Sequence, residues 1–507
     1  MPRASTPFPL RVGCIDIGSN GVRCMAAEFA DPAHSTVLLQ ERAPVRLGES
    51  VFRDGALAPA AMDQAVQALA RFRGQMDALN LRAVRIVATS AVREAANREA
   101  FLRRAAKEAG VRVEPIGGGE EARLVALAVA GRLELDGKPW LVMDLGGGSL
   151  EVSLLDRKGV AWTESHPMGS VRLLEEFRAA ARDPARFARL VGDVLGPLRL
   201  PGRDGRRLGG LAATGGNIED LARLAGGDGG GPLPVRELER LADKLAGMTE
   251  QERVEKLGLR PDRADVILPA AHVYLHVARM AAVPAIHVPK VGLKEGVLLD
   301  LVGQLGGDAP RRTEQVVEAG AIGLGRRHQF DEAHGRQVAR LALTLFDALR
   351  KEHGLGAPDR RILHAAALLH DVGRIVSGRK HHKHSQYLIA ASELPGFPQE
   401  DVGLVGQVAR YHRRKEPTTD HEAFAALSKE DQDRVERMAA LLRVADALDR
   451  SHHAAVRELR VKRGRGKLTL QAVGEGDLLL EQWALQKKGG LFERIFKVGL
   501  QLEAGRA

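Results

Sequence analysis

The spacing of apolar and polar positions predicts an α/β protein in the first three-fifths of the chain. Between about residues 11 and 45, three segments show the apolar patterning of strands joined in a meander. A helical pattern follows at 59–79. Strands are then predicted at 84–91 and 111–116, and helices at 97–110 and 120–133.

The same order of elements then starts again. Strand patterns recur in "PWLVMDLGGGSLEVSLLD" and "GVAWTESHPMG", and apolar "GGLAAT" precedes the helical pattern "IEDLARL". Such a repeat indicates a structural duplication. It predicts two similar α/β lobes that face each other across a cleft, lobe I at 1–132 and lobe II at 133–306.

A linker is predicted at 303–312, in "GQLGGDAPRR". Beyond it the patterns are helical to about residue 455, which predicts a helical domain at 311–455. The last segment, 456–507, is predicted to be a small strand-rich tail.

The strongest chemical signal is a pair of glycine turns, each at the end of an apolar strand. Asp16 is followed by "IGSNG" and Asp144 by "LGGGS", with Glu151 just beyond. Glycine lets backbone N–H groups converge on an anion. The aspartates would repel bare phosphate, so a divalent metal or a water should lie between acid and phosphate. The alternative is two tight hairpins with structural glycines.

Two further segments add groups suited to phosphate chemistry. A strand runs into Thr89 and Ser90 ahead of Arg93, and hydroxyl and guanidinium groups at a strand end suit phosphate oxygens. In "GGGEEAR", Glu120 and Glu121 open a helix. Acids in a first helical turn usually answer the helix dipole, but a carboxylate over a phosphate cleft can also activate water. No G-x-x-x-x-G-K-[ST] motif is present, which excludes a P-loop protein.

The amino-acid composition indicates what the cores consist of and in which compartment the protein is expected. Of 507 residues, 44% are hydrophobic but only 4% aromatic, so the cores should consist of Leu, Val and Ala. The two cysteines, Cys14 and Cys24, are expected to be core thiols in a reducing compartment. The amino end lacks a signal-peptide pattern, and no window reaches about 18 uninterrupted apolar residues. A soluble, cytoplasmic protein with no transmembrane segment is expected.

The net charge of +10 favours polyanionic partners. It is concentrated at residues 311–507, which carry 34 basic and 26 acidic side chains and 12 of the 17 histidines. A solvated basic surface is the alternative explanation. Nucleic-acid binding is disfavoured, because aromatic residues for base stacking are scarce.

Taken together, the motifs resemble those of the exopolyphosphatase/guanosine pentaphosphatase (Ppx/GppA) family. "CIDIGSNGVR", "ATSAVREAAN", "GGGEEARL", "MDLGGGSLEV", "HPMGSVRL", "ATGGNIEDLA" and "GLKEG" occur in order. The resemblance covers about residues 11–304. It implies two ribonuclease-H-like lobes of the actin-like ATPase and sugar-kinase fold. The later part resembles the HD-type extension of longer members, which also implies a homodimer.

The resemblance implies a role for each matched residue. Glu121 would be the general base and Arg93 would neutralise the transferred phosphoryl group. Asp144 and Glu151 would hold Mg²⁺, with Mn²⁺ as the alternative. The phosphates would be bound by Asp16, Gly18, Ser19, Asn20, Gly146, Gly147, Gly148, Ser149, Gly215 and Lys294.

Three positions depart from the family pattern. Leu150 stands in place of threonine, Lys294 in place of arginine, and Gly21 in place of a frequent serine. Lysine keeps the charge but loses the bidentate fork of arginine. Because the acids are intact, the departures bear on substrate preference more than on activity.

The helical region adds a second candidate metal site. His334, "HD" at His370 and Asp371, and Asp446 follow the ligand order of HD phosphohydrolases. Imidazole and carboxylate ligands suit Mn, Fe, Mg or Zn. His382, His384 and His412 are candidates for a second metal or phosphate. The alternative is a degenerate HD domain whose basic face guides a polyphosphate chain.

These observations predict a magnesium-dependent exopolyphosphatase that removes terminal phosphates from inorganic polyphosphate one at a time. The first alternative is hydrolysis of guanosine pentaphosphate in the same cleft. A kinase of the same fold is less favoured, because no acceptor pocket is legible. A non-catalytic polyphosphate or alarmone sensor is also less favoured, because all the acids are present.

Overall fold

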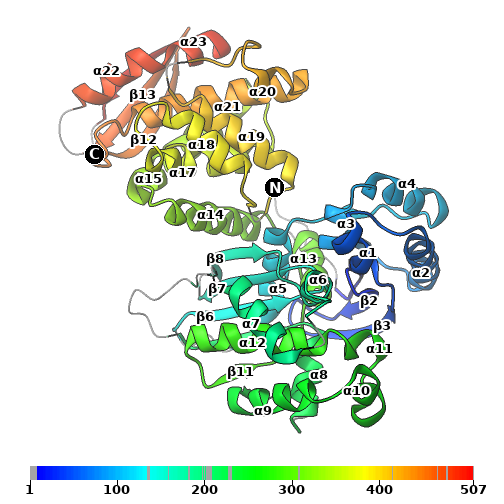
Figure 1. The fold of residues 1–507 in the computed structure, drawn as a ribbon. Helices are drawn as coiled ribbons and strands as arrows, with labels where there is room; N and C mark the ends of the chain where they lie inside the picture. Colours follow the sequence, from blue (N-terminus) through cyan, green and yellow to red (C-terminus); the bar gives the residue numbers. More distant parts are fainter. Residues whose placement is uncertain are drawn as a thin grey trace. The chain divides into compact units, whose positions relative to one another are not determined.

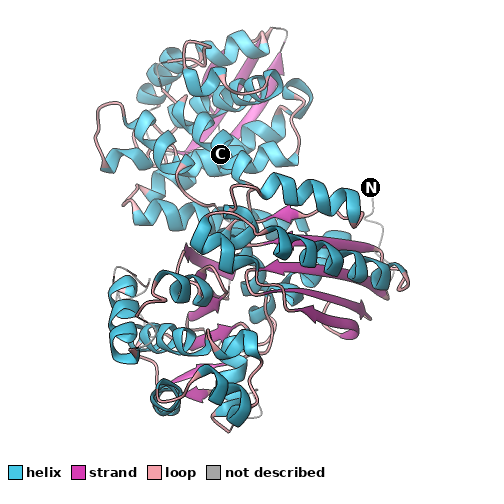
Figure 2. Ribbon diagram, turned by 45° about the vertical axis from the view of Figure 1, so that its right-hand side comes forward, coloured by secondary structure: helices cyan, strands magenta, loops and turns pink. Residues whose placement is uncertain are grey.

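The computed structural model of the protein forms two compact units, residues 1–313 and 314–507, which are described separately. Figure 1 shows the chain coloured along the sequence, and Figure 2 distinguishes helices from strands. The structure describes residues 8–133, 137–157, 159–180, 183–196, 198, 200, 208–226, 231–306, 309–394, 396–413, 415–464, 466–474 and 478–505.

The first unit begins with a five-stranded sheet in the order β3-β2-β1-β4-β5. The antiparallel meander predicted at its start is confirmed, and β4 and β5 then add in parallel. Asp16 pairs with Arg23 and Gly18 with Gly21, so the first glycine turn is a tight hairpin that joins the ends of β1 and β2. The strands are β1 (Leu10–Gly18), β2 (Gly21–Phe29), β3 (Ser35–Ala43), β4 (Ala83–Ala88) and β5 (Glu114–Pro115).

The second sheet repeats this arrangement. Its order is β10-β11-β9-β6-β7-β8, with β6 to β8 as the antiparallel meander and β9 and β11 parallel to β6. Asp144 pairs with Glu151 directly before the second glycine turn. The strands are β6 (Trp140–Leu145), β7 (Leu150–Asp156), β8 (Gly159–His166), β9 (Gly210–Thr214), β10 (Leu233–Pro234) and β11 (Ala285–His287).

Two helices, α5 and α13, pack between the two sheets. Leu124 of α5 (Gly118–Ala130) and Val297 of α13 (Leu293–Leu305) share one buried core with Val12 of the first sheet and Val142 of the second. The backbones of α5 and α13 touch, because a Cβ at Gly296 would lie 1.9 Å from the carbonyl oxygen of Leu124. This close packing fixes the two sheets relative to each other.

The outer faces of the sheets are covered by the remaining helices of the unit. The first sheet packs its Ile15 and Ile17 against Phe72 and Phe101, and both cysteines are free and buried as predicted. Its helices are α1 (Leu47–Asp54), α2 (Pro59–Asp77), α3 (Ser90–Glu94) and α4 (Arg98–Glu108). The second sheet carries α6 (Ser170–Glu176), α7 (Pro184–Leu195), α8 (Gly216–Leu224), α9 (Val235–Ala246), α10 (Glu250–Leu257), α11 (Pro261–Ala264) and α12 (Ile267–Ala281).

The second unit is mainly helical, as Figure 2 shows by colour. Its core joins Leu341, Leu363 and Leu441 from three long helices. Its helices are α14 (Ala309–Arg327, which crosses the boundary between the units), α15 (Glu332–Ala348), α16 (Arg350–His353), α17 (Ala357–Leu369), a 3₁₀ turn (Val372–Ile375), α18 (His381–Ala390), α19 (Gln399–Arg410), α20 (Glu422–Ala425) and α21 (Lys429–Ala447).

Two sequence predictions need correction here. The segment predicted as a linker is largely helical, because α13 extends to Leu305 and α14 begins at Ala309; residues 307–308 lie outside the described part. The tail is mixed rather than strand-rich. Its three strands form the sheet β12-β13-β14, but the leucine run near 479 is a helix. The elements are β12 (Val456–Gly464), β13 (Lys467–Gly474), α22 (Leu479–Lys488), α23 (Gly490–Phe496) and β14 (Gly499–Ala504).

Within the described part of the chain, no helix combines the length and apolar character needed to cross a membrane.

Two Gly→Ala changes, one inside the contact between α5 and α13 and one in α2 outside it, should have opposite effects on stability. Gly296→Ala places a methyl group against backbone that cannot move freely, so it should lower the free energy of unfolding by about 3 kcal/mol. Gly74→Ala, in α2 with nothing within 4 Å of the added Cβ, should raise it by about 0.5–1 kcal/mol. Calorimetry of both variants checks the pair, and equal transition temperatures would contradict the packing argument.

Candidate functional site

A cleft of about 780 Å³ lies where the ends of the two sheets meet within the first unit. It is lined by both glycine turns, by the start of α5 and by the segment leading into α13. From the predicted phosphate-binding set the lining includes Asp16, Gly18, Ser19, Asn20, Gly146, Gly147, Ser149, Gly215 and Lys294. The structure therefore brings together motifs that lie nearly 280 residues apart in sequence.

Asp16 and Asp144 occupy equivalent places at the ends of β1 and β6. Each accepts a hydrogen bond from a neighbouring side chain. Arg23 donates to Asp16 over 3.1 Å, and the Thr214 hydroxyl donates to Asp144 over 2.6 Å. Burial raises the pKa of both carboxyls above the ordinary value, and the neighbouring Arg23 offsets part of this effect at Asp16. Two buried acids at one end of a cleft suit a bound cation.

Three carboxylates converge beside the second turn. One oxygen each of Glu121, Asp144 and Glu151 lies within 4.8 Å of the others, and all three side chains are buried. Ser165 donates to Oε1 of Glu151 over 2.8 Å, whereas Oε2 of Glu151 and Oε2 of Glu121 find no hydrogen-bond partner among the described residues. Buried acceptors without partners are costly, so they point to a ligand that is a cation or a donor.

Burial and mutual repulsion raise the pKa values in this cluster. Burial, with the negative charge of Glu151, raises the pKa of Glu121 well above its usual value. Burial and the charge of Asp144 raise the pKa of Glu151 to about 8. A nearby cation would reverse both effects, because opposite charge favours the ionised form.

Arg93 lies behind the cluster rather than in the lining of the cleft. Its Nη1 donates to the carbonyl of Ile116 over 2.7 Å and is 4.0 Å from Oε2 of Glu121. It is the cation nearest to the predicted general base. The neighbouring Glu120 has a different role, because its carboxylate pairs with Arg123 and Arg85.

The second glycine turn is packed so closely that side chains are excluded. A Cβ at Gly147 would lie 2.9 Å from the Ser19 Cβ, and one at Gly148 would lie 2.2 Å from the Ser90 hydroxyl. Ser19 and Ser90 also contact each other through their hydroxyls at 3.0 Å. The two turns and the 89–90 segment thus form one interlocked group.

Gly215, in the "ATGG" turn, has a φ of +102°, a conformation that L side chains rarely adopt. A Cβ there would lie 2.9 Å from the carbonyl oxygen of Leu145 and 3.5 Å from Asp144 Oδ1. Glycine at this position lets the backbone of lobe II approach the carboxylate cluster.

Ion pairs join the lobes along the cleft. Arg42 pairs with Asp262, and Arg46 pairs with Asp265 over 2.6 Å. A third pair joins Arg172 of lobe II to Glu94 of lobe I over 2.7 Å. The same Arg172 donates to the carbonyl of Gly148 over 2.8 Å and lies 4.1 Å above the Phe52 ring.

Sequence reasoning missed most basic side chains of the cleft. Arg263 donates to Asn217 over 2.6 Å, and neither residue belongs to a glycine turn. Asn217 directly follows the "ATGG" motif in α8, whereas Arg263 lies in α11, far from that motif in sequence. Arg23 and Arg42 lie on β2 and β3, where an arginine gives no sequence signal of a site. The basic lining consists of Arg23, Arg42, Arg223, Arg260, Arg263, Lys290 and Lys294.

Two of the departures from the family pattern have clear structural settings. Leu150 is fully buried in the core beneath the second sheet, where an apolar side chain packs without needing a polar partner. Lys294 lines the cleft and pairs with Glu295 over 3.1 Å. Leu150 therefore presents no side chain to the cleft, and Lys294 presents a cation there.

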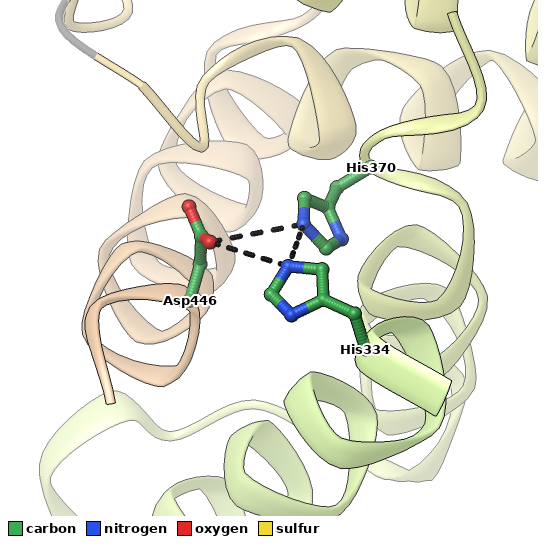
Figure 3. A group of neighbouring side chains, drawn as sticks. All are labelled: His334, His370 and Asp446. Carbon is green, nitrogen blue, oxygen red and sulfur yellow. Dashed lines mark hydrogen bonds and ion pairs between the residues drawn. The ribbon is translucent and has the colours of Figure 1, made fainter. Parts of the chain in front are cut away.

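The second unit contains a separate cluster of histidines and acids. Figure 3 shows His334, His370 and Asp446, which come from three helical segments and face one another. Nε2 of His334 lies 3.2 Å from Nε2 of His370, and Asp446 Oδ1 lies 3.6 and 3.8 Å from the two.

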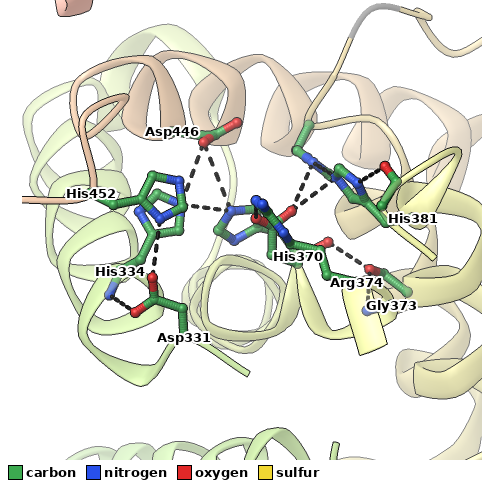
Figure 4. A network of polar contacts seen from close by, with 12 residues as sticks. Asp331, His334, His370, Gly373, Arg374, His381, Asp446 and His452 are labelled. Carbon is green, nitrogen blue, oxygen red and sulfur yellow. Dashed lines mark hydrogen bonds and ion pairs between the residues drawn. The ribbon is translucent and has the colours of Figure 1, made fainter. Parts of the chain in front are cut away.

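Asp371 belongs to a neighbouring group with His381 and His412, whose donor atoms lie within 4.8 Å of one another. The sequence suggested His382, His384 and His412 for a second metal or phosphate. Among the described residues, His412 joins the group, but its histidine partner is His381. The side chain of His381 (Figure 4) is 7% exposed at the start of α18, whereas its neighbour His382 is only partly buried.

Comparison with known proteins agrees with this architecture. Residues 29–305 match the model of the Ppx/GppA phosphatase family, and residues 316–487 match domain III of Ppx/GppA phosphatases. The first unit has the actin-like, ribonuclease-H-like α/β fold, followed by a helical C-terminal region.

Similar proteins carry two different names. A Vibrio vulnificus protein named guanosine-5'-triphosphate,3'-diphosphate pyrophosphatase is 28% identical over 79% of this chain and 80% of its own length. An Aliivibrio fischeri protein of the same name is 26% identical over 87% of this chain and 88% of its own length.

Among solved structures, an exopolyphosphatase from Cytophaga hutchinsonii has a TM-score of 0.54 and 28% identity, covering 58% of this chain and 98% of that one. A Ppx/GppA family member from Aquifex aeolicus has a TM-score of 0.50, 28% identity, and the same two coverages. With more than half of its length matched by the family model, the chain belongs to the Ppx/GppA phosphatase family.

Proposed function

We propose that the cleft of the first unit removes the terminal phosphate of inorganic polyphosphate and releases orthophosphate. Membership of the family makes the chain a phosphatase that hydrolyses phosphoanhydride bonds. The observation that supports this reaction is the cluster of Glu121, Asp144 and Glu151 beside two interlocked glycine turns in one cleft. Guanosine pentaphosphate is the second candidate substrate, supported by the names of the curated relatives.

The carboxylate cluster fits a divalent cation with oxygen ligands. Asp144 and Glu151 would hold it, and the unpartnered Oε2 of Glu151 is a suitable donor atom. All the donors are oxygens, which favours Mg²⁺, with Mn²⁺ as the alternative. When bound, the cation supplies positive charge that neutralises phosphate oxygens.

A bound cation would also make the charge of the cleft suitable for a polyanion. The lining has seven basic side chains, but it has equally many acidic ones, namely Asp16, Glu41, Glu121, Asp144, Glu219, Asp220 and Glu295. Several of the basic groups are already paired, as Arg42 is with Asp262 and Lys294 with Glu295. Polyanion binding should therefore depend strongly on the divalent ion.

Glu121 is placed to act as the general base. It opens α5 at the floor of the cleft, and its raised pKa gives the carboxylate a higher affinity for a proton than an exposed glutamate has. Arg93, 4.0 Å away, would orient Glu121 and offset negative charge on the transferred phosphoryl group. The backbone N–H groups of the turns and the hydroxyls of Ser19 and Ser149 would bind the terminal phosphates.

The lining favours the polymer over the nucleotide. Among the described residues that line the cleft, none is aromatic, so a guanine base would find no ring on which to stack. A polyphosphate chain has no base and needs only charges and hydrogen-bond donors. The cleft therefore suits polyphosphate better than guanosine pentaphosphate.

For the second unit, we propose an HD-type helical domain. The order His334, His370, Asp371 and Asp446 along the chain supports the assignment, as does the meeting of His334, His370 and Asp446 in one group with Asp371 in an adjacent one. The homodimer implied by the family resemblance stays a prediction.

Substrate preference is tested by measuring orthophosphate release with Mg²⁺ from long-chain polyphosphate and from guanosine pentaphosphate in parallel. The expected result is a kcat/KM for polyphosphate at least about tenfold higher, because the cleft lacks a stacking surface for the base. A higher kcat/KM for the nucleotide would move the assignment to the second candidate. No release from either would contradict the proposed function.

Glu121→Gln should lower kcat by about 10²–10⁴-fold while leaving the binding of polyphosphate nearly unchanged, because it removes the base but keeps the shape. The matched control is Glu120→Gln, whose carboxylate pairs with Arg123 and Arg85 rather than facing the reaction. Wild-type activity in Glu121→Gln would exclude the proposed base.

The pKa of Glu151 predicts how stability depends on pH in metal-free protein. Its folded-state value of about 8 exceeds the unfolded value of about 4.3, so its contribution to stability is complete below pH ~4.3 and is lost as pH rises to 8. Glu151→Gln should remove most of this loss, because glutamine does not ionise. Thermal unfolding of both proteins at several pH values, in a chelator, measures the difference.

Addition of Mg²⁺ at pH 8 should raise the melting temperature of the wild type more than that of Glu151→Gln, because the ion stabilises the ionised carboxylate. The same pH dependence in both proteins would show that Glu151 is not held in a strained, buried state.

A further inference from the structure

The second glycine turn is held in place by the first turn of α6. Ser170 donates its backbone N–H to the carbonyl oxygen of Gly146 over 3.1 Å. Val171 and Arg172 donate their backbone N–H groups to the carbonyl oxygen of Gly147 over 2.8 and 3.0 Å. The start of this helix thus binds two carbonyl groups of the turn.

The contact between α6 and the turn requires a glycine before the helix. A Cβ at Gly169 would lie 2.3 Å from the backbone nitrogen of Gly148 and 2.4 Å from the carbonyl oxygen of Gly147. The two backbones are therefore in direct contact, and the position of α6 determines the position of the turn.

A third carbonyl of the turn is bound by a side chain. Nε of Arg172 donates to the carbonyl oxygen of Gly148 over 2.8 Å. Its Nη2 donates to both carboxylate oxygens of Glu94 over 2.9 and 2.7 Å, and its guanidinium lies 4.1 Å above the ring of Phe52. Only 12% of the Arg172 side chain is exposed. A planar guanidinium with these three partners is held in one orientation.

The directions of these carbonyls determine where the N–H groups of the turn point. The three peptide units are trans, and in a trans peptide the C=O and N–H groups point in opposite directions. Because the carbonyls point toward α6 and Arg172, the N–H groups of Gly147, Gly148 and Ser149 point away from them. Gly147 and Ser149 line the cleft, whereas Arg172 is not among the described residues of its lining. The three N–H groups therefore face the side from which a phosphate would approach.

Lobe I supports both the turn and the arginine. A Cβ at Gly148 would lie 2.4 Å from Cζ of Phe52, so this ring touches the peptide as well as the guanidinium of Arg172. Phe52 also packs against the fully buried Val171 of α6. One aromatic side chain of lobe I thus contacts each part of the arrangement.

We propose that Arg172 is a positioning residue for the phosphatase reaction. By fixing the carbonyl of Gly148, it directs the N–H of Ser149 to the terminal phosphate, although Arg172 itself does not touch that phosphate. Glu94 and Phe52 of lobe I hold Arg172 in this orientation. The inference rests on the proposed function, which assigns the terminal phosphate to this turn.

The test is the affinity for tripolyphosphate with Mg²⁺, measured by titration calorimetry in Glu121→Gln so that the ligand is not consumed. Adding Arg172→Gln should weaken binding about tenfold or more, because the charged donor to the Gly148 carbonyl is lost. Arg46→Gln is the matched control. Arg46 also joins the lobes, through Asp265, but is not in the described lining of the cleft, so affinity should change less than about twofold.

Two further readouts separate positioning from a structural role. Pyrophosphate and tripolyphosphate should lose affinity by the same factor in Arg172→Gln, because the turn binds the end of either chain. A general loosening of the cleft would instead cost the longer ligand more. Arg172→Lys keeps a charged donor and should restore affinity to within about threefold of the starting protein.

Glu94→Gln is a second variant, at a side chain that is 38% exposed and so places little demand on folding. It should weaken tripolyphosphate binding about threefold, because Arg172 loses its partner in lobe I. If Arg172→Gln fails to fold by circular dichroism, this variant decides, and unchanged affinity overturns the proposal.

An affinity of Arg172→Gln within twofold of the starting protein would also overturn the proposal, as would an equal loss in Arg46→Gln. The proposed hydrolysis is judged separately. Wild-type protein that binds tripolyphosphate through Arg172 but releases no orthophosphate would contradict the hydrolysis and support the positioning role.

Discussion

The packing of α5 against α13 is the contact on which the site depends. These helices lie between the two sheets and share a core with both, and their backbones touch at Gly296 and Leu124. Glu121 opens α5, so the position of its carboxylate follows from where that helix is held. A loosened contact would displace Glu121 from Asp144 and Glu151 even though no ligand residue had changed.

Much of the first unit could be read from its sequence because its signals are local. The meander patterns of both sheets are determined by apolar residues in short runs, and the glycine turns mark where each β1-like strand ends. The strand predicted at 111–116 is shorter in the structure, because only Glu114 and Pro115 pair with β4. The leucine run near 479 was attributed to strand-rich sequence, whereas the buried residues of α22, Glu481, Ala484 and Leu485, have the i, i+3, i+4 spacing of a helix.

The site residues were predicted only in part from the sequence. Residues inside motifs, such as Asp144 and Gly215, were found because each motif has a compact pattern. Arg263 and Asn217 were missed, because tertiary packing of the separate helices α11 and α8 brings them together at the cleft. His381 could not be distinguished from His382 and His384 by type. Only the phase of the α18 start decides which imidazole faces Asp371.

The ion pairs across the cleft have a mechanical consequence. Arg42, Arg46 and Arg172 each connect one lobe to the other, and Arg172 also holds the carbonyl of Gly148. A hinge rotation that separated the lobes would break these pairs together and would pull on the phosphate-binding turn. These ion pairs therefore hold the two lobes together, and they weaken as dissolved ions screen their charges. Salt concentration then becomes a control on how readily the lobes part to admit a chain end.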